Sequence, residues 1–285
     1  MRGLLDGLDL GGRPARMLFV HAHPDDETLT TGVALAHHAG RGDEVHVLTC
    51  TLGEEGEVIP PALAHLEGDG PALAAHRRDE LHRAMAVLGV THHLLEDADG
   101  AFRDSGMAGS AAAAHPRAWA GVAPEVAAAA VAAVVERLDP DVVVTYDAGG
   151  GYGHPDHVRT HAATRQALRT TGADLPLLGR LTPLTWASED HAWLAAHVPA
   201  GEGWVVPDAT SEYAGDVVPD EVVTRAVVDT SVVPAQEQAL RAHETQVVVG
   251  PGWYALSNRH VFRLAGREGY ARLDLATGRP VGEAS

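Results

Sequence analysis

The feature that most constrains this chain is a charged heptapeptide, His-Ala-His-Pro-Asp-Asp-Glu at residues 21–27, which directly follows the apolar run 17–20. A short β-branched and aromatic run predicts a buried strand, and a proline at a first helical position predicts that a helix begins there. Two imidazoles and three carboxylates therefore stand at a strand-to-helix turn. Turns of this kind are where α/β proteins place their ligand sites.

The His-Pro-Asp pattern returns at residues 154–157, as His-Pro-Asp-His, after the Val-rich run 141–146 and a glycine-rich turn. A helix start explains a proline and an aspartate at one such turn, because the proline presets φ and the carboxylate complements the helix dipole. It does not require a histidine on either side. Two copies with flanking histidines therefore favour a functional site over two ordinary helix starts.

Composition and charge narrow the possible partners. The 285 residues are 45% hydrophobic and carry a formal charge of −18, which would repel phosphate backbones and anionic lipid surfaces. We therefore expect neither nucleic acid nor membrane as a partner. Cys50 is the only cysteine and closes an apolar run, so we expect a buried thiol in a cytoplasmic protein. The oligomeric state is not fixed by the sequence, and a homo-oligomer stays open.

Strand-like and helix-like segments alternate along the first two thirds of the chain, which predicts βαβ units and a Rossmann-like, mainly parallel sheet flanked by helices. The expected strands are 17–21, 44–51, 92–95 and 141–146, and the expected helices are 28–39, 72–88, 124–138 and 156–170. Two long irregular stretches, 52–70 and 96–117, separate some of these elements. Loops of that length are usually functional.

The expected domain organisation has four parts. They are a flexible N-terminal arm at 1–15, a Rossmann-like catalytic core at 16–175, a smaller α+β portion at 176–275 that completes the sheet and the substrate pocket, and a tail at 276–285. Within the third part we expect strands at 180–186 and 222–229 and a helix at 234–243. If strands 17–21 and 141–146 are neighbours at the point where the winding reverses, the two charged motifs face each other.

Three of the motif residues form a His₂-carboxylate set that suits a zinc-type metal, namely His23, Asp26 and His157. Such a set also accepts Fe²⁺ or Co²⁺. Asp25 adjoins a ligand without being needed as one, so it is the candidate base for a metal-activated water. Asp156 can orient an imidazole by accepting its second N–H, unless it only complements the helix dipole.

Two residues on the glycine-rich turn, Tyr152 and His154, can donate hydrogen bonds to a developing oxyanion. At all these positions the chain resembles the PIG-L/LmbE-like zinc-dependent N-deacetylases, which carry Ala-His-Pro-Asp-Asp-Glu after the first strand and a later His-Pro-Asp-His. The resemblance implies a Rossmann-like fold, zinc on the three ligands named above, and Asp25 as general acid/base in removing an N-acetyl group from an amino sugar.

One branch of that family is more similar still, on the stretches 49–59, 103–109, 150–154 and 242–250. Its members remove acetate from N-acetylglucosaminyl-inositol in mycothiol biosynthesis. The resemblance implies that Arg77 and Asp104 grip sugar hydroxyls, and Met107 is a candidate for an acetyl pocket. Ala-Gly at 148–149 replaces an expected Pro-Asn, and 170–225 matches poorly, which leaves the aglycone open.

Each of these residues also has an ordinary structural interpretation. Arg77 can pair on a helix surface, Asp104 can form an Asx turn, and Met107 can fill a core gap. His243 can complement the end of a helix dipole or lie near the pocket. The acidic run at 54–57 is either a solvated face or a border of the metal site.

Four other functions remain open from the sequence. A mycothiol S-conjugate amidase, or a deacetylase for another N-acetyl amino sugar, would share the metal motif. A non-catalytic protein could retain the zinc alone. A nucleotide-binding Rossmann protein without hydrolase activity would need a Gly-x-Gly-x-x-Gly turn after the first strand, where this chain has His-Pro-Asp-Asp.

Overall fold

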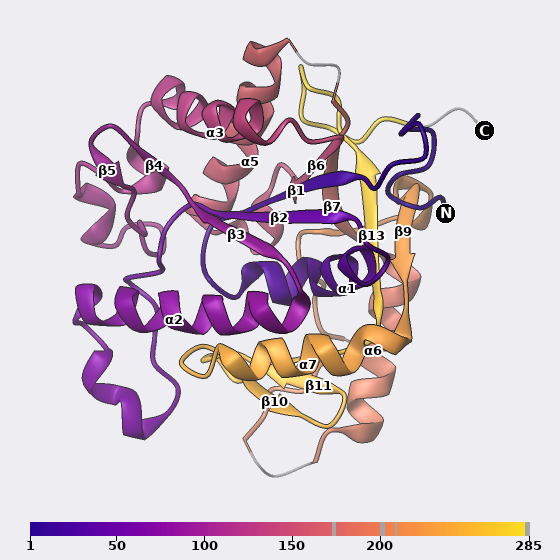
Figure 1. Ribbon diagram of the computed structural model, residues 1–285. Helices are drawn as coiled ribbons and strands as arrows, with labels where there is room; N and C mark the ends of the chain where they lie inside the picture. Colours follow the sequence, from indigo (N-terminus) through magenta and orange to yellow (C-terminus); the bar gives the residue numbers. More distant parts are fainter. Residues whose placement is uncertain (173–174, 200–202, 209, 283–285) are drawn as a thin grey trace.

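The computed structural model describes residues 1–172, 175–199, 203–208 and 210–282. A sheet with helices on both faces forms its centre (Figure 1). Five strands run parallel in the order β3-β2-β1-β6-β7: Thr91–Leu94, Glu44–Thr49, Arg16–His21, Val142–Tyr146 and Leu177–Pro183. Beyond β7, the strand β13 (Arg267–Arg272) pairs antiparallel with β7, and β9 (Arg225–Val228) pairs antiparallel with β13. The short strand β8 (Val217–Val218) pairs in parallel with β7. The predicted Rossmann-like, mainly parallel sheet is confirmed.

The two strands that precede the charged motifs are neighbours, as the sequence predicts. Residues Met17 to Phe19 of β1 pair in parallel with Val142 to Val144 of β6. Both strands therefore end at the same edge of the sheet, where the turns that follow His21 and Tyr146 lie close together. More than 120 residues of sequence separate these turns.

Alternate residues of the central strands face opposite layers of helices. Met17 and Phe19 of β1 pack with α1 (Asp26–Gly40) and α2 (Gly70–Leu88), whereas Leu18 and Val20 pack with α3 (Pro124–Leu138) and α5 (Pro155–Thr171). Figure 1 shows α3 and α5 on one face of the sheet and α1 and α2 on the other. Helix α7 (Val233–Ala242) lies beside α1 and α2.

The remaining described elements are short or peripheral. They are the hairpin β4 (Glu96–Asp97) and β5 (Gly100–Ala101), the turn α4 (Gly150–Gly153), the helix α6 (Leu184–His197), the three-stranded sheet β10 (Val248–Gly250), β11 (Trp253–Ala255) and β12 (Val261–Arg263), and 3₁₀ turns at 61–66, 112–114, 119–121, 220–222 and 230–232. The prediction of a strand at 180–186 is wrong at its C-terminal end. Pro183 has no N–H to continue a ladder, so β7 stops there and α6 begins at Leu184.

The N-terminal segment differs from the expected flexible arm. Leu4 is 1% exposed and belongs to the same apolar cluster as Met17. The guanidinium of Arg225 donates hydrogen bonds to the carbonyl oxygens of Gly3, Leu4 and Asp6. A buried leucine and an arginine far along the chain thus attach this segment to the core, and neither contact has a local sequence signal.

A carboxylate from β13 reaches into the middle of α1. The backbone amides of Val33 and Ala34 donate to the two oxygens of Glu268, at 2.7 and 2.9 Å, and the Tyr270 hydroxyl donates at 2.7 Å. The carbonyl of Thr30, which Ala34 would bind in a regular helix, accepts from Arg180 Nε at 3.0 Å. Side chains of the C-terminal half therefore bind the backbone in the middle of the helix that begins at the charged motif.

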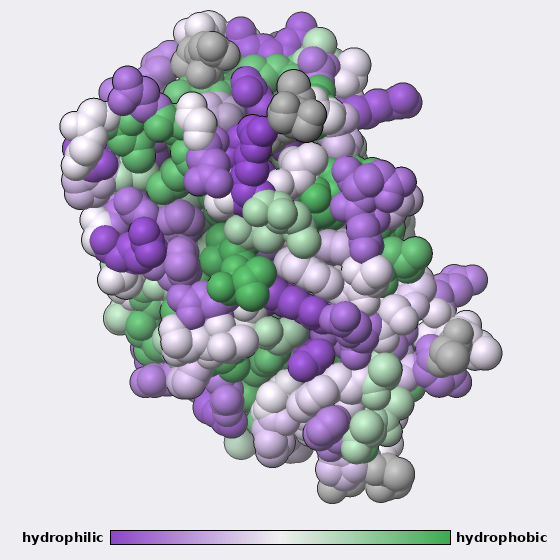
Figure 2. All heavy atoms as spheres, turned by 90° about the vertical axis from the view of Figure 1, so that its right-hand side faces the viewer, coloured by the Kyte–Doolittle hydropathy of each residue, from purple (hydrophilic) through white to green (hydrophobic). Residues whose placement is uncertain are grey.

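Among the described residues, no helix combines the length and the apolar composition that a membrane crossing requires. On the face shown in Figure 2, hydrophobic residues lie in separate groups among hydrophilic ones. The expected burial of Cys50 is confirmed, and burial raises the pKa of its thiol to about 12.

Candidate metal centre and active site

The turn between β1 and α1 holds its aspartate in an unusual backbone conformation. Asp25 has φ 106° and ψ −37°, a region that L-residues with a side chain rarely adopt. Strain of this kind costs about 1–3 kcal/mol and clusters at functional sites. The amide of Asp25 donates to Glu27 Oε2 at 3.0 Å, which fixes the turn from inside the helix.

The two predicted histidine ligands approach the same carboxylate oxygen of Asp26, the third predicted ligand. Asp26 Oδ2 lies 3.4 Å from His23 Nδ1 and 3.2 Å from His157 Nε2. Bonds of about 2.0–2.1 Å to one tetrahedral metal place two ligand atoms roughly 3.3 Å apart. All three side chains are buried, as a metal centre with few water ligands requires.

The other ring nitrogen of each imidazole already faces an acceptor. His23 Nε2 lies 3.2 Å from Asp156 Oδ2, and His157 Nδ1 lies 3.2 Å from the carbonyl oxygen of Gly150. These contacts place the protons on the outer nitrogens and leave His23 Nδ1 and His157 Nε2 as lone pairs toward Asp26. Within the described chain, His157 Nε2 is buried and has no hydrogen-bond partner. The residues present therefore fit a divalent metal.

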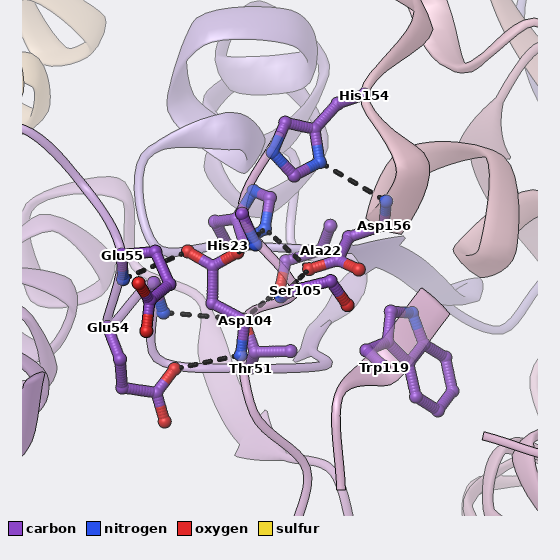
Figure 3. Close-up of polar contacts among 12 residues, drawn as sticks. Ala22, His23, Thr51, Glu54, Glu55, Asp104, Ser105, Trp119, His154 and Asp156 are labelled. Atoms are coloured by element: carbon purple, nitrogen blue, oxygen red, sulfur yellow. Dashed lines mark hydrogen bonds and ion pairs between the residues drawn. The ribbon is translucent and has the colours of Figure 1, made fainter. Parts of the chain in front are cut away.

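Asp156 orients an imidazole, but the ring is that of His23 and not that of its sequence neighbour His157. Its oxygens also accept the amide of Ser105 at 2.9 Å (Figure 3) and that of Ala120 at 3.1 Å. The long loop before α3 thus anchors the carboxylate that faces His23.

The predicted oxyanion donors, His154 and Tyr152, lie beside the histidine rings of the cluster. His154 Nδ1 accepts the Asp156 amide at 3.2 Å, so a neutral ring carries its proton on Nε2 (Figure 3). Burial, with the nearby His23 and His157, lowers the pKa of His154 to about 4. The Tyr152 side chain is 63% exposed, and its ring centroid is 5.1 Å from that of His157.

Asp25, the residue before the predicted ligand Asp26, lies next to Arg77. Arg77 Nη2 is 3.4 Å from Asp25 Oδ2 and donates to the carbonyl of Pro24, while Nη1 donates to the carbonyl of Gly53 at 2.8 Å. Burial and the neighbouring Asp26 raise the pKa of Asp25 to about 7, although Arg77 opposes the rise. Arg77 is 3% exposed, so the helix-surface interpretation is wrong.

The loop that carries the other substrate candidates borders the same cluster. Asp104 Oδ1 accepts the Gly106 amide at 2.8 Å, an Asx turn, and also lies 3.5 Å from His23 Nε2. The Asp104 amide donates to Glu54 Oε2 at 3.0 Å, so part of the acidic run borders the site (Figure 3). Met107 is 57% exposed and does not fill a core gap.

Tyr146 is a site residue that sequence reasoning missed. Its hydroxyl donates to Asp26 Oδ2 at 2.7 Å and accepts the Ala22 amide at 2.9 Å, and its ring stacks on that of His157 at 4.3 Å. Its place at the end of a Val-rich strand, directly before the glycine-rich turn, was the available signal. Glu27 and His243, both buried, form a second missed contact at 3.0 Å.

The fold and this centre define the class: an α/β protein whose buried histidine and carboxylate groups, at the carboxyl ends of adjacent parallel strands, can bind a divalent metal. The family model described as PIG-L: GlcNAc-PI de-N-acetylase matches residues 18–168, more than half of the chain. The chain belongs to this family and is an amide-hydrolysing deacetylase.

Curated relatives match most of the chain. One from Rhodococcus opacus (strain B4), named 1D-myo-inositol 2-acetamido-2-deoxy-alpha-D-glucopyranoside deacetylase, is 45% identical and the match covers 85% of this chain and 86% of the relative. The N,N'-diacetylchitobiose deacetylase from Pyrococcus horikoshii has a TM-score of 0.50 at 20% identity, covering 81% of this chain and 70% of that one. GalB, a 4-carboxy-2-hydroxymuconate hydratase from Pseudomonas putida KT2440, has a TM-score of 0.51 at 18% identity, with coverages of 80% and 78%. The two solved structures support the fold alone.

Proposed function

We propose that this enzyme is a zinc-dependent hydrolase that removes acetate from 1D-myo-inositol 2-acetamido-2-deoxy-alpha-D-glucopyranoside, the deacetylation step of mycothiol biosynthesis. The observation that carries this proposal is the 45% identity, over 85% of the chain, to a relative named for that activity. The buried His₂-carboxylate centre supports the hydrolytic chemistry. Such a small polar substrate and a lone buried thiol fit a cytoplasmic enzyme.

His23 Nδ1, Asp26 and His157 Nε2 would hold the metal. Imidazole nitrogens and a carboxylate suit zinc, and Fe²⁺ is compatible with the same donors. A bound divalent ion would lower the pKa of a water molecule toward neutrality. Tyr146 and Asp156 hold Asp26 and His23 in their orientations.

The chain's own residues then carry the proton transfers. Asp25, with a pKa near 7, would remove a proton as the water oxygen bonds to the acetamide carbonyl carbon. His154 Nε2–H and the Tyr152 hydroxyl would donate to the oxyanion. Asp25 would return the proton to nitrogen as the C–N bond breaks, giving acetate and a free amine.

Substrate recognition is proposed for the loop side of the site. Asp104 and Met107 lie on the loop beside His23, where a sugar hydroxyl and the acetyl methyl could bind. Arg77 contacts Asp25 and the carbonyl oxygens of Pro24 and Gly53. We propose that it supports sugar binding indirectly, because these contacts fix Asp25 and the loop at Gly53 in place.

The experiment is acetate release from the N-acetylglucosaminyl-inositol substrate, measured beside a mycothiol S-conjugate and free N-acetylglucosamine. Each substrate is tested on enzyme that has been treated with a chelator and then restored with zinc or Fe²⁺. Metal-dependent turnover of the inositol glycoside well above the other two supports the proposal. Faster turnover of the S-conjugate would show an amidase, and equal turnover of free N-acetylglucosamine would show that the inositol is not recognised.

A further inference from the structure

We propose that His243 is a positioning residue for the base, acting on Asp25 through the carboxylate of Glu27. The inference rests on the proposed function only in taking Asp25 as the base. The contact joins the end of α7 to the first turn of α1, elements more than 200 residues apart in the sequence.

The Glu27 carboxylate connects the two residues. Its Oε1 lies 3.0 Å from His243 Nε2 and accepts the Thr28 hydroxyl at 2.6 Å, while Oε2 accepts the Asp25 amide at 3.0 Å. Glu27 is 0% exposed, so no solvent replaces a lost donor. The hydrogen bond to the Asp25 amide opposes relaxation of that residue from its φ of 106°.

His243 is itself held rigidly. Its side chain is 0% exposed, its amide donates to the carbonyl of Leu240, and its own carbonyl accepts the amides of Gln246 and Val247. Of the polar atoms in the described chain, none bonds its Nδ1, so the contact with Glu27 is the hydrogen bond that the ring makes. A helix-end dipole role would not require a buried ring aimed at a carboxylate.

The next residues of the same segment hold the other side of the Pro24–Asp25 turn. The amide and hydroxyl of Thr245 donate to the two oxygens of Glu80 on α2, each at 2.8 Å. Arg77, one turn earlier on α2, donates to the carbonyl of Pro24 and faces Asp25. His243 and Thr245 therefore hold the turn in place, one through α1 and the other through α2.

Removing the imidazole should misplace the base without removing the metal or the substrate site. We expect His243→Leu to lower kcat by about 10–100-fold with KM within about twofold, because a displacement near 1 Å at a reacting group has effects of this size. His243→Gln can present an N–H near the position of Nε2 and should recover most of the rate. Glu244→Gln, at the exposed neighbouring position, is the matched control and should keep the parent rate.

The decisive comparison repeats His243→Leu in an Asp25→Ala background. If His243 acts through Asp25, its substitution has no further effect there, since the losses of residues that act as a unit are not additive. A further tenfold loss in that background would overturn the proposal, as would a parent kcat in the single variant. If leucine prevents folding, His243→Asn removes the same donor, because its amide ends near the Nδ1 position.

A second readout does not depend on turnover. Hydrogen exchange of the peptide that contains residues 21–30 should become faster in His243→Leu than in the parent and in Glu244→Gln, because the Asp25 amide loses its fixed acceptor. Unchanged exchange would overturn the proposal even if kcat falls. If the parent hydrolyses none of the acetylated substrates, the proposed function fails, and the exchange comparison still decides the role of His243.

Discussion

At the scale of single residues, the sequence predicted which charged side chains lie together, but only part of what surrounds them. His23 and His157 both lie within 3.4 Å of Asp26 Oδ2 because β1 and β6 are neighbours, which the motif pattern and the topology rule predicted. The contacts of Tyr146 and Glu27 depend on side chains meeting across the fold. A local pattern can mark the position of such a residue, as the strand end does for Tyr146, but not the side chain that it contacts.

Asp25→Ala should lower kcat by about 10²–10⁴-fold, the usual contribution of a general acid/base group. The variant should still bind one metal, because Asp25 is not among the converging ligands. Acetate release and metal analysis of the purified protein measure the two effects. A variant that hydrolyses the substrate at the parent rate would show that another group is the base.

Gly150→Ala should weaken metal binding by about 10–100-fold, since the groups that orient metal ligands have effects of this size. A Cβ at Gly150 would lie 2.8 Å from the Cβ of His157, and the backbone φ of +65° adds strain. Gly151→Ala is the control, because Gly151 has φ +70° but open space around a Cβ. Competition with a coloured chelator gives both zinc affinities. Equal losses would assign the effect to backbone strain rather than to His157.

At the scale of elements, the sequence predicted those whose signals are local. Helix α3 was predicted at its observed bounds, Pro124–Leu138, because a proline starts it and an apolar Ala and Val face runs through it. Strand β13 was missed, because Glu268 and the flanking arginines read as exposed. Its burial is possible only because α1 supplies amide donors to the carboxylate.

Glu268→Leu should reduce the free energy of unfolding by about 2–5 kcal/mol, since it removes the buried carboxylate that accepts from two amides of α1 and from the Tyr270 hydroxyl. Tyr270→Phe removes only one donor to the carboxylate and should have a loss of about 1–2 kcal/mol. Urea unfolding followed by circular dichroism measures both. A smaller loss for Glu268→Leu than for Tyr270→Phe would contradict a role for the carboxylate in holding α1.

At the scale of the whole molecule, both halves of the chain build one site. The matched family region contains the proposed metal ligands and Asp25, while α7 and β13 come from the C-terminal portion. The poorly matched stretch 170–225 contains α6, whose start the sequence did not predict. The strands of this stretch, β7 and β8, are fixed by pairing with strands and not by a local pattern, and the distant partners of β7 cannot be read from the sequence of the stretch itself.

Removal of the metal should lower the melting temperature by several degrees. An ion at a hundred times its Kd stabilises the folded state by about 2.7 kcal/mol, and the buried carboxylates and imidazoles lose that compensation when a chelator is added. Thermal unfolding with chelator, and again after zinc is restored, tests this. His157→Ala is the control and should show no response to either addition.

The carboxylate of Glu268 in the middle of α1 has a consequence for how the enzyme is made. During translation the motif-bearing strands and helices emerge first, yet the carboxylate that accepts from two amides of the catalytic helix is added only at residue 268. A nascent chain stalled before that point should remain sensitive to protease and bind metal weakly, even though it already contains every proposed ligand. The enzyme would thus become active only late in its synthesis, and a chain that ends before residue 268 would not hydrolyse substrate in the cell.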